Sequence, residues 1–189
     1  PEIIQNLIKY LTYRGQSKEI RRLSKLIKAN RQESLVVMET LEENAVQQVE
    51  KKKLHEDNVV IVKLDQMADR DVTGSSGVIA SRIAERYQKP TIVMVYEDKK
   101  VVASIRLPHD GNLDSAAVIN QIKRERQHAS DWKIVSGGGH ACAAGFKADV
   151  SDLNEFKDGM QHYFAGYVPN VQDVAVGIPH TTSLDEALF

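Results

Sequence analysis

A change in the spacing of apolar residues near Asn58 constrains the fold of this chain more than any other sequence feature. Before Asn58 apolar residues recur at helical intervals, whereas short β-branched runs appear after it. The first of these runs, 59–64, has the sequence Val-Val-Ile-Val-Lys-Leu, which is typical of a buried strand. We therefore expect a helical first third followed by a part that contains a sheet.

The first third of the sequence predicts helices only. A first helix is expected over 3–11, and it ends before Gly15. A second helix is expected to begin at Ser17, and a third is expected from about 32 to 54, with its apolar residues along a single stripe. Basic residues crowd the second of these helices: Lys18, Arg21, Arg22, Lys25, Lys28 and Arg31.

Strands and helices alternate in the remainder of the chain. In chain order we expect a strand over 59–64, a helix over 76–87, strands over 91–96 and 101–106, a helix over 113–126, a glycine loop at 137–139, a short helical turn over 141–144, a strand over 145–150 and a helix over 151–164. This order predicts an α/β fold, in which a mixed β-sheet is flanked by helices and preceded by an all-helical connector arm. We divide the chain into a connector at 1–57, an α/β domain at 58–165 and a tail or linker at 166–189.

Composition excludes several classes of protein. The 189 residues, 42% hydrophobic and 27% charged, are enough for one substantial core. No apolar run approaches the roughly 20 residues that span a bilayer, and the start has no signal-like leader, so we expect no membrane or secretory role. One cysteine and no Cys-x-x-Cys pair favour a cytoplasmic setting. Because the chain opens on Pro1, we expect it to be a piece of a longer protein or a processed product.

Three successive glycines precede a histidine at Gly137, Gly138, Gly139 and His140. Glycine permits backbone angles closed to other residues, so several amides can approach one anion. If Ala141 opens a helix, its amide end adds positive charge at the same point, and His140 can donate a hydrogen bond to a phosphate oxygen. The motif predicts a phosphate-contacting loop; a flexible turn with a surface histidine is the alternative.

Ser104 and Arg106 lie two residues apart at the end of an expected strand. Strand alternation places them on one face, where a hydroxyl and a planar guanidinium can grip one phosphate together. An edge strand with its polar residues turned outward is the alternative.

Four stretches, taken in order, resemble the DHH-associated domain of RecJ-type exonucleases in the DHH phosphoesterase superfamily. They are 77–87, 89–94, Ser104-x-Arg106 and 137–146. The resemblance covers roughly 58–164, and the order of four motifs is more specific than any one of them. The helical first third resembles the connector that joins this domain to the catalytic DHH lobe.

The resemblance implies a two-lobe hydrolase, a single-strand exonuclease of DNA repair and recombination. Its upstream DHH lobe would bind manganese or magnesium and cleave the phosphodiester, whereas this chain would supply no catalytic residue, metal ligand or cofactor. The implied partners are that lobe and single-stranded nucleic acid, with DNA favoured. The implied phosphate contacts are Ser104, Arg106, Gly137, Gly138, Gly139 and His140, with Arg82 as a weaker candidate.

The sequence departs from an enzyme of that family because it has no Asp-His-His triplet. Its histidines are scattered without paired carboxylates at metal-ligand spacing, so we expect this chain alone to be inactive. His109 and Asp110 are expected in a solvated turn. The sequence also lacks the Gly-x-Ser-x-Gly motif of a serine hydrolase and the glutamate and cysteine pair of a zinc deaminase.

Two alternatives remain open from the sequence, as does the oligomeric state. One is a DHH-family phosphodiesterase acting on short oligonucleotides, cyclic dinucleotides or polyphosphate, although the alanine-rich stretch 141–144 favours the RecJ-like branch. The other, of a different class, is a non-catalytic nucleic-acid-binding or interaction module whose helical arm docks a partner.

Overall fold

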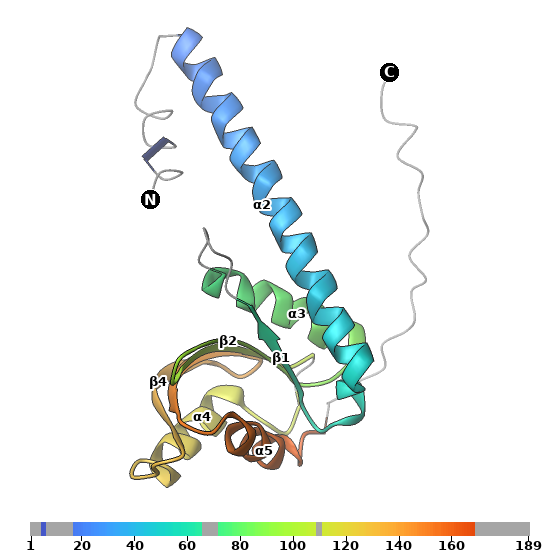
Figure 1. Cartoon of the computed structure of the whole chain (residues 1–189), viewed down its shortest axis with the longest axis vertical. Helices are drawn as coiled ribbons and strands as arrows, with labels where there is room; N and C mark the ends of the chain where they lie inside the picture. The colour runs from blue at the N-terminus through green and yellow to red at the C-terminus, as the bar shows by residue number, and fades with distance from the viewer. Residues whose placement is uncertain (1–4, 7–16, 66–71, 109–110, 169–189) are drawn as a thin grey trace.

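The structure is a computed structural model that describes residues 5–6, 17–65, 72–108 and 111–168 (Figure 1). Most of the expected first helix, and the tail from 169 onward, lie outside these residues. The described helices and strands are α2 (Ser17–Lys52), β1 (Val60–Leu64), α3 (Ser76–Tyr87), β2 (Thr91–Glu97), β3 (Lys100–Arg106), α4 (Ser115–Glu125), β4 (Trp132–His140), β5 (Ala143–Val150) and α5 (Leu153–Phe164), with short 3-10 helices at Leu54–Glu56 and Thr73–Ser75. These elements confirm the expected α/β class. No helix in this part of the chain is long and apolar enough to span a bilayer.

The five strands form one mixed sheet in the order β1-β2-β3-β5-β4. Strands β1 and β2 are parallel, and the other pairs are antiparallel. A tight turn joins β2 to β3, where Asp98 adopts a φ of 52°. The expected hairpin of these two strands is therefore confirmed.

The two faces of the sheet are covered differently. Helices α4 and α5 cover one face, the α4–α5 face, where Trp132, Phe146 and Phe156 are buried in one apolar cluster. Helix α3 and the second half of α2 cover the other, the α3 face, through a second cluster that includes Ile79 and Val93. The strand residues of that second cluster come from β1 and β2 alone. The part of the α3 face that β3, β5 and β4 form lies outside the cluster.

The part of the α3 face outside this apolar cluster, called the open half below, spans β3, which α3 partly covers, and β5 and β4. Its residues follow from strand alternation and register, because their sequence neighbours Val101, Ala103, Ile105, Ala144, Phe146 and Ala148 belong to the cluster on the α4–α5 face. The open half comprises Lys100, Val102, Ser104, Arg106, Ala143, Gly145, Lys147, Asp149, Lys133, Val135, Ser136, Gly138 and His140.

Helix α2 is one continuous helix of 36 residues, so the expected break near residue 31 is wrong. The sequence offers no glycine or proline from 16 to 73 that would end a helix there. The second half of α2 buries Leu41, Ala45 and Val49 in the same cluster as α3, whereas Leu35, at the middle of the helix, stays exposed. The boundary between arm and body at residue 58 stays a prediction.

The expected glycine loop and the helical turn over 141–144 are also wrong, because both lie in a β-hairpin. Gly137, Gly138 and Gly139 belong to β4, which pairs with β5 through a turn at Ala141 and Cys142. The reason is pairing: each glycine finds a partner on β5, and this ladder outweighs the weak strand propensity of glycine.

Two glutamines occupy the free edge of the sheet at β1. Gln48 of α2 donates to the Lys63 carbonyl at 2.8 Å and accepts from the Lys63 N–H at 3.4 Å. Gln161 of α5 does the same at Val59, with distances of 2.8 Å and 3.1 Å. Each side-chain amide therefore takes the place that a neighbouring strand would occupy.

Candidate functional site

Ser104 lies on β3 opposite the start of α3. Its Oγ is 2.8 Å from Oγ of Ser76, and Ser76 donates to the Thr73 carbonyl at 2.7 Å. Since Ser76 has one hydroxyl proton, Ser104 is the donor in the bond between them. Contact between Ser104 and an anion then requires that hydroxyl to give up its bond to Ser76.

Arg106 lies on the same face, as strand alternation predicted, and its guanidinium lies against the first turn of α3. A Cβ atom on Gly77 would be 2.8 Å from Nη2 of Arg106, so the glycine makes room for this side chain. The guanidinium donates from Nη1 to the Ile105 carbonyl at 2.7 Å. Among the described residues no carboxylate forms an ion pair with it. Partial burial lowers the pKa of the Arg106 guanidinium, as expected for a cation that has lost water.

Strand register brings the glycine-histidine segment beside these two side chains. Arg106 is opposite Ala143, which is opposite His140; Ser104 is opposite Gly145, which is opposite Gly138. Two strand spacings separate the Cα atoms of Arg106 and His140 by roughly 10 Å, a gap that a phosphate and two side chains can fill. Only small residues lie between them.

His140 is held in place through its backbone. Its carbonyl accepts a hydrogen bond from Oγ of buried Ser115 at 2.9 Å, at the start of α4. The backbone N–H of Ser115 donates to the Ala141 carbonyl at 2.8 Å, and Leu107 donates to the Cys142 carbonyl at 2.9 Å. The tip of the β4–β5 hairpin is therefore tied to α4 and to the end of β3, while the His140 side chain stays exposed.

The three glycines have different roles in the structure. A Cβ on Gly137 would lie 2.7 Å from Cβ of Phe146, and one on Gly139 would lie 2.5 Å from Cα of Ala144. These two glycines allow β4 to approach β5. Gly138 has no atom within 4 Å of its Cβ position, so nothing inside the described protein requires a glycine there. The absence of a side chain at Gly138 leaves this position of the open half unobstructed.

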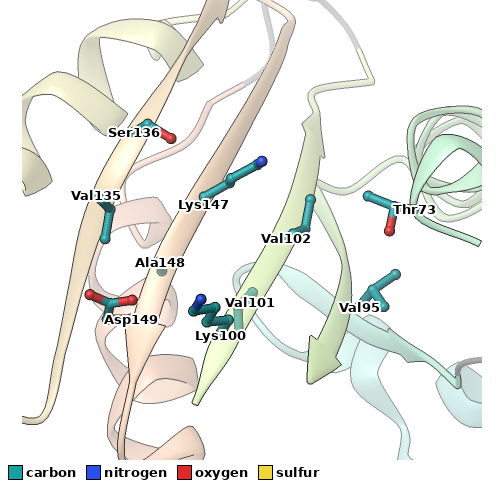
Figure 2. Close-up of a pocket in the computed structure, with 10 residues that line it drawn as sticks. All are labelled: Thr73, Val95, Lys100, Val101, Val102, Val135, Ser136, Lys147, Ala148 and Asp149. Carbon is teal, nitrogen blue, oxygen red and sulfur yellow. The ribbon is translucent and has the colours of Figure 1, made fainter. Parts of the chain in front are cut away.

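A groove of about 330 Å³ runs along the open half beside this surface. It is lined by Ser76, Ser104, Ser136, Gly145 and Lys147, among others. A second groove of about 350 Å³ adjoins it and shares Thr73, Val102, Ser136 and Lys147 (Figure 2). The open half thus offers a ligand hydroxyl groups, cationic side chains and the small residues Gly138 and Gly145.

Arg82 is not part of this arrangement. Its guanidinium forms an ion pair with Glu42 of α2. Four residues that sequence reasoning missed are placed at the site by the structure, namely Ser76, Gly77, Gly145 and Ser115. The signal for Gly145 was present, because Ala143, Gly145 and Lys147 alternate with the apolar residues Ala144 and Phe146.

Within the described ranges, no three His, Cys, Asp or Glu side chains gather closely enough to hold a metal ion. His109 and Asp110, expected in a solvated turn, lie outside the described residues.

Comparison with known proteins places this geometry in a wider context. A family model described as the DHHA1 domain matches residues 56–166. No curated protein matches the chain.

Among solved structures, RecJ from Thermus thermophilus in complex with Mn²⁺ has a TM-score of 0.62 and 19% identity, over 91% of this chain and 24% of that one. The same protein in complex with Mg²⁺ has a TM-score of 0.56 and 20% identity, over 85% of this chain and 22% of that one. An exonuclease RecJ bound to manganese has a TM-score of 0.59 and 18% identity, over 84% of this chain and 36% of that one. At these identities the likeness shows a shared fold, and this chain spans about a quarter to a third of those proteins.

Proposed function

The chain belongs to the DHHA1 domain family, and on that premise we propose that it is the substrate-gripping part of a RecJ-like single-strand exonuclease. In this proposal an upstream DHH lobe, with bound manganese or magnesium, hydrolyses the phosphodiester, and this chain holds the phosphates of the strand. Single-stranded DNA is the favoured substrate, and DNA repair and recombination in the cytoplasm are the proposed setting.

The observation that carries the proposal is the shared position of Arg106, Gly138 and His140 on the open half of the sheet. A half-buried guanidinium without a carboxylate partner in the described structure shares the open half with Gly138, a glycine that internal packing does not require. Burying a cation without an anion is unfavourable, and a bound phosphate would supply the missing charge. This combination supports a phosphate site better than it supports a structural role.

The chemistry of the grip follows from the donors that the site offers. The guanidinium of Arg106 has five N–H donors, and one bond, to Ile105, is found for it in the described structure. The first turn of α3 lies against this side chain, so the positive end of that helix adds to the attraction for an anion. His140 can approach the same anion from β4, on the other side of β5 from Arg106. The same phosphate would then be held from both sides.

The proposal is tested by measuring binding of the 189-residue chain to fluorescently labelled single-stranded DNA at low salt, where phosphate contacts are strongest. Arg106→Ala is expected to weaken binding by about 1.5–3 kcal/mol, the range for hydrogen bonds to charged groups. Arg106→Lys is expected to restore part of the loss, because an ammonium cannot make the two-pronged contact. His140→Ala is expected to weaken binding as well.

Arg124→Ala is the matched control, because it removes the same charge from an exposed position on α4, which covers the opposite face of the sheet. Its binding should match that of the parent protein. The proposal is wrong if Arg106→Ala and His140→Ala bind as tightly as the parent while Arg22→Ala, on the basic segment of α2, binds weakly.

A further inference from the structure

The second groove on the open half has its own cationic lining, apart from Arg106. Lys147 of β5 lies opposite Val102 of β3 on one side and Ser136 of β4 on the other, so no carboxylate is directly across from it. Figure 2 shows the Lys147 side chain reaching from β5 toward Val102. Lys147 is exposed and forms no ion pair within the described residues.

The neighbouring row of the sheet holds lysines and acidic residues in equal number. Asp149 is flanked by Lys100 on β3 and Lys133 on β4, each directly opposite it in the register. Lys100 is in turn opposite Glu97 of β2, so the charges of this row balance. Lys147, which has no acidic residue across from it, is therefore the cation that favours an anion at this end of the open half.

Apolar side chains form the walls of the same groove. Val95, Val102 and Val135 line it, and Val135 is 56% exposed. The register of β4 shifts between Ile134 and Ser136, which marks a β-bulge at Val135. A bulge re-aims a side chain away from the regular alternation, and here it adds Val135 to the lining of the groove. A groove with apolar walls and ammonium ends suits a nucleotide, whose base is flat and whose phosphate is charged.

We propose that Lys147, in this groove between β3, β5 and β4, binds a second phosphate of the same strand that Arg106 and His140 hold. The inference rests on the proposed function. Lys147 lies in register with Val102, four residues before Arg106 on β3, so the two phosphates are roughly 13 Å apart along the sheet. The two grooves share Thr73, Val102, Ser136 and Lys147, and the first of them extends to Ser104, two residues before Arg106 on β3. In the register Ser104, Gly145 and Gly138 lie between the two phosphates, and Val102 and Val135 contact the base or sugar beside the Lys147 phosphate.

The test uses a length series of oligothymidylates, from the dinucleotide upward, bound to the 189-residue chain at low salt. In the parent protein, affinity should rise in a step when the strand becomes long enough to reach Lys147. Lys147→Gln should lose that step, a decrease of up to roughly fivefold for an exposed charge pair, while dinucleotide binding stays unchanged. Lys147→Arg should keep the step, and Lys123→Gln on α4 is the control of equal charge.

Two further readouts identify the contact as a phosphate. The slope of log affinity against log salt concentration should fall by roughly 0.7 in Lys147→Gln with the longer strands. A single neutral methylphosphonate linkage, moved along the longer strand, should weaken binding to the parent at two separated positions and to Lys147→Gln at one. The measurement on the parent uses the unaltered protein, so it does not depend on the folding of a variant.

The outcomes separate this inference from the proposed function. If Arg106→Ala weakens binding at every length while Lys147→Gln keeps both the step and the salt slope, the second phosphate contact is wrong and the proposed function stands. If Arg106→Ala leaves dinucleotide binding unchanged, the proposed function itself fails, and the inference fails with it.

Discussion

The two faces of one sheet bury their side chains to very different extents. On the α4–α5 face the aromatic rings of Trp132 and Phe156 meet edge to face with centroids 5.4 Å apart, and both residues are almost completely buried. On the α3 face, β1 and β2 present valines to α3, but the next strands present serine, arginine, glycine and lysine. The change from apolar to polar side chains therefore occurs within one face of the sheet, at β3.

Under the proposed function, this difference separates residues that pack the core from residues that contact a ligand. If the α3 face served packing alone, we would expect its apolar residues to extend across β5 and β4, as they do on the α4–α5 face. The open half instead places a half-buried arginine and an exposed lysine beside glycine. The comparison predicts that substitutions on the α4–α5 face change stability and that substitutions on the open half change binding.

The largest effect on stability is expected from Phe156→Ala. Phe156 is fully buried between Trp132 and Phe146, so its removal leaves a cavity that the sheet cannot fill. We expect the free energy of unfolding to fall by about 3–5 kcal/mol, as measured by urea denaturation. Val135→Ala, an apolar change on the open half, is the control and should cost much less. Similar losses for the two variants would contradict the distinction between the faces.

Gly139→Ala is expected to have the next largest effect, although it adds only one methyl group. The new Cβ would lie 2.5 Å from Cα of Ala144 and would also collide with the Ala143 carbonyl. Both contacts are backbone atoms that cannot rotate away, so β4 must separate locally from β5. We expect a loss of about 1–3 kcal/mol in the free energy of unfolding. A thermal midpoint equal to that of the parent would show that the hairpin pairs differently.

Gly138→Ala should have the smallest effect on stability, within about 0.5 kcal/mol, because no atom lies near the added Cβ. If the glycine is needed for a ligand, the same methyl group should weaken binding to single-stranded DNA by roughly 1 kcal/mol or more through overpacking. Measuring both quantities on Gly138→Ala and Gly139→Ala sharpens the comparison. Unchanged DNA binding in Gly138→Ala would mean that Gly138 does not contact the bound DNA.

Most of the fold could be predicted from the sequence because most elements have an unambiguous period. The strands at 91–96 and 101–106 and the helix at 76–87 have clear apolar patterns, and the structure confirms them. Strand β4 was missed because glycines at 137–139 have weak strand propensity and resemble a loop. A signal was present in Trp132 and Ile134, which alternate with Lys133, but it is only a few residues long.

Only part of the candidate site could be predicted in the same way. The shared face of Ser104 and Arg106 follows from alternation along one strand, and the structure confirms it. The role of Ser76 depends on how α3 sits above β3, which no local pattern encodes. The difference between Gly138 and its two neighbours depends on the distance between β4 and β5. Such features arise from tertiary packing and strand register, so a single sequence does not reveal them.

The glutamines at the edge of β1 have a consequence for how the molecule behaves in a crowded solution. An unpaired strand edge is a template on which another chain can add a strand, and repeated addition leads to fibrils. Gln48 and Gln161 occupy that template at Lys63 and Val59, so an incoming chain would first have to displace two amides that each hold both backbone groups. They come from α2 and α5, on opposite sides of β1 in the sequence. Self-association at this edge is therefore resisted only after both helices have folded onto the sheet.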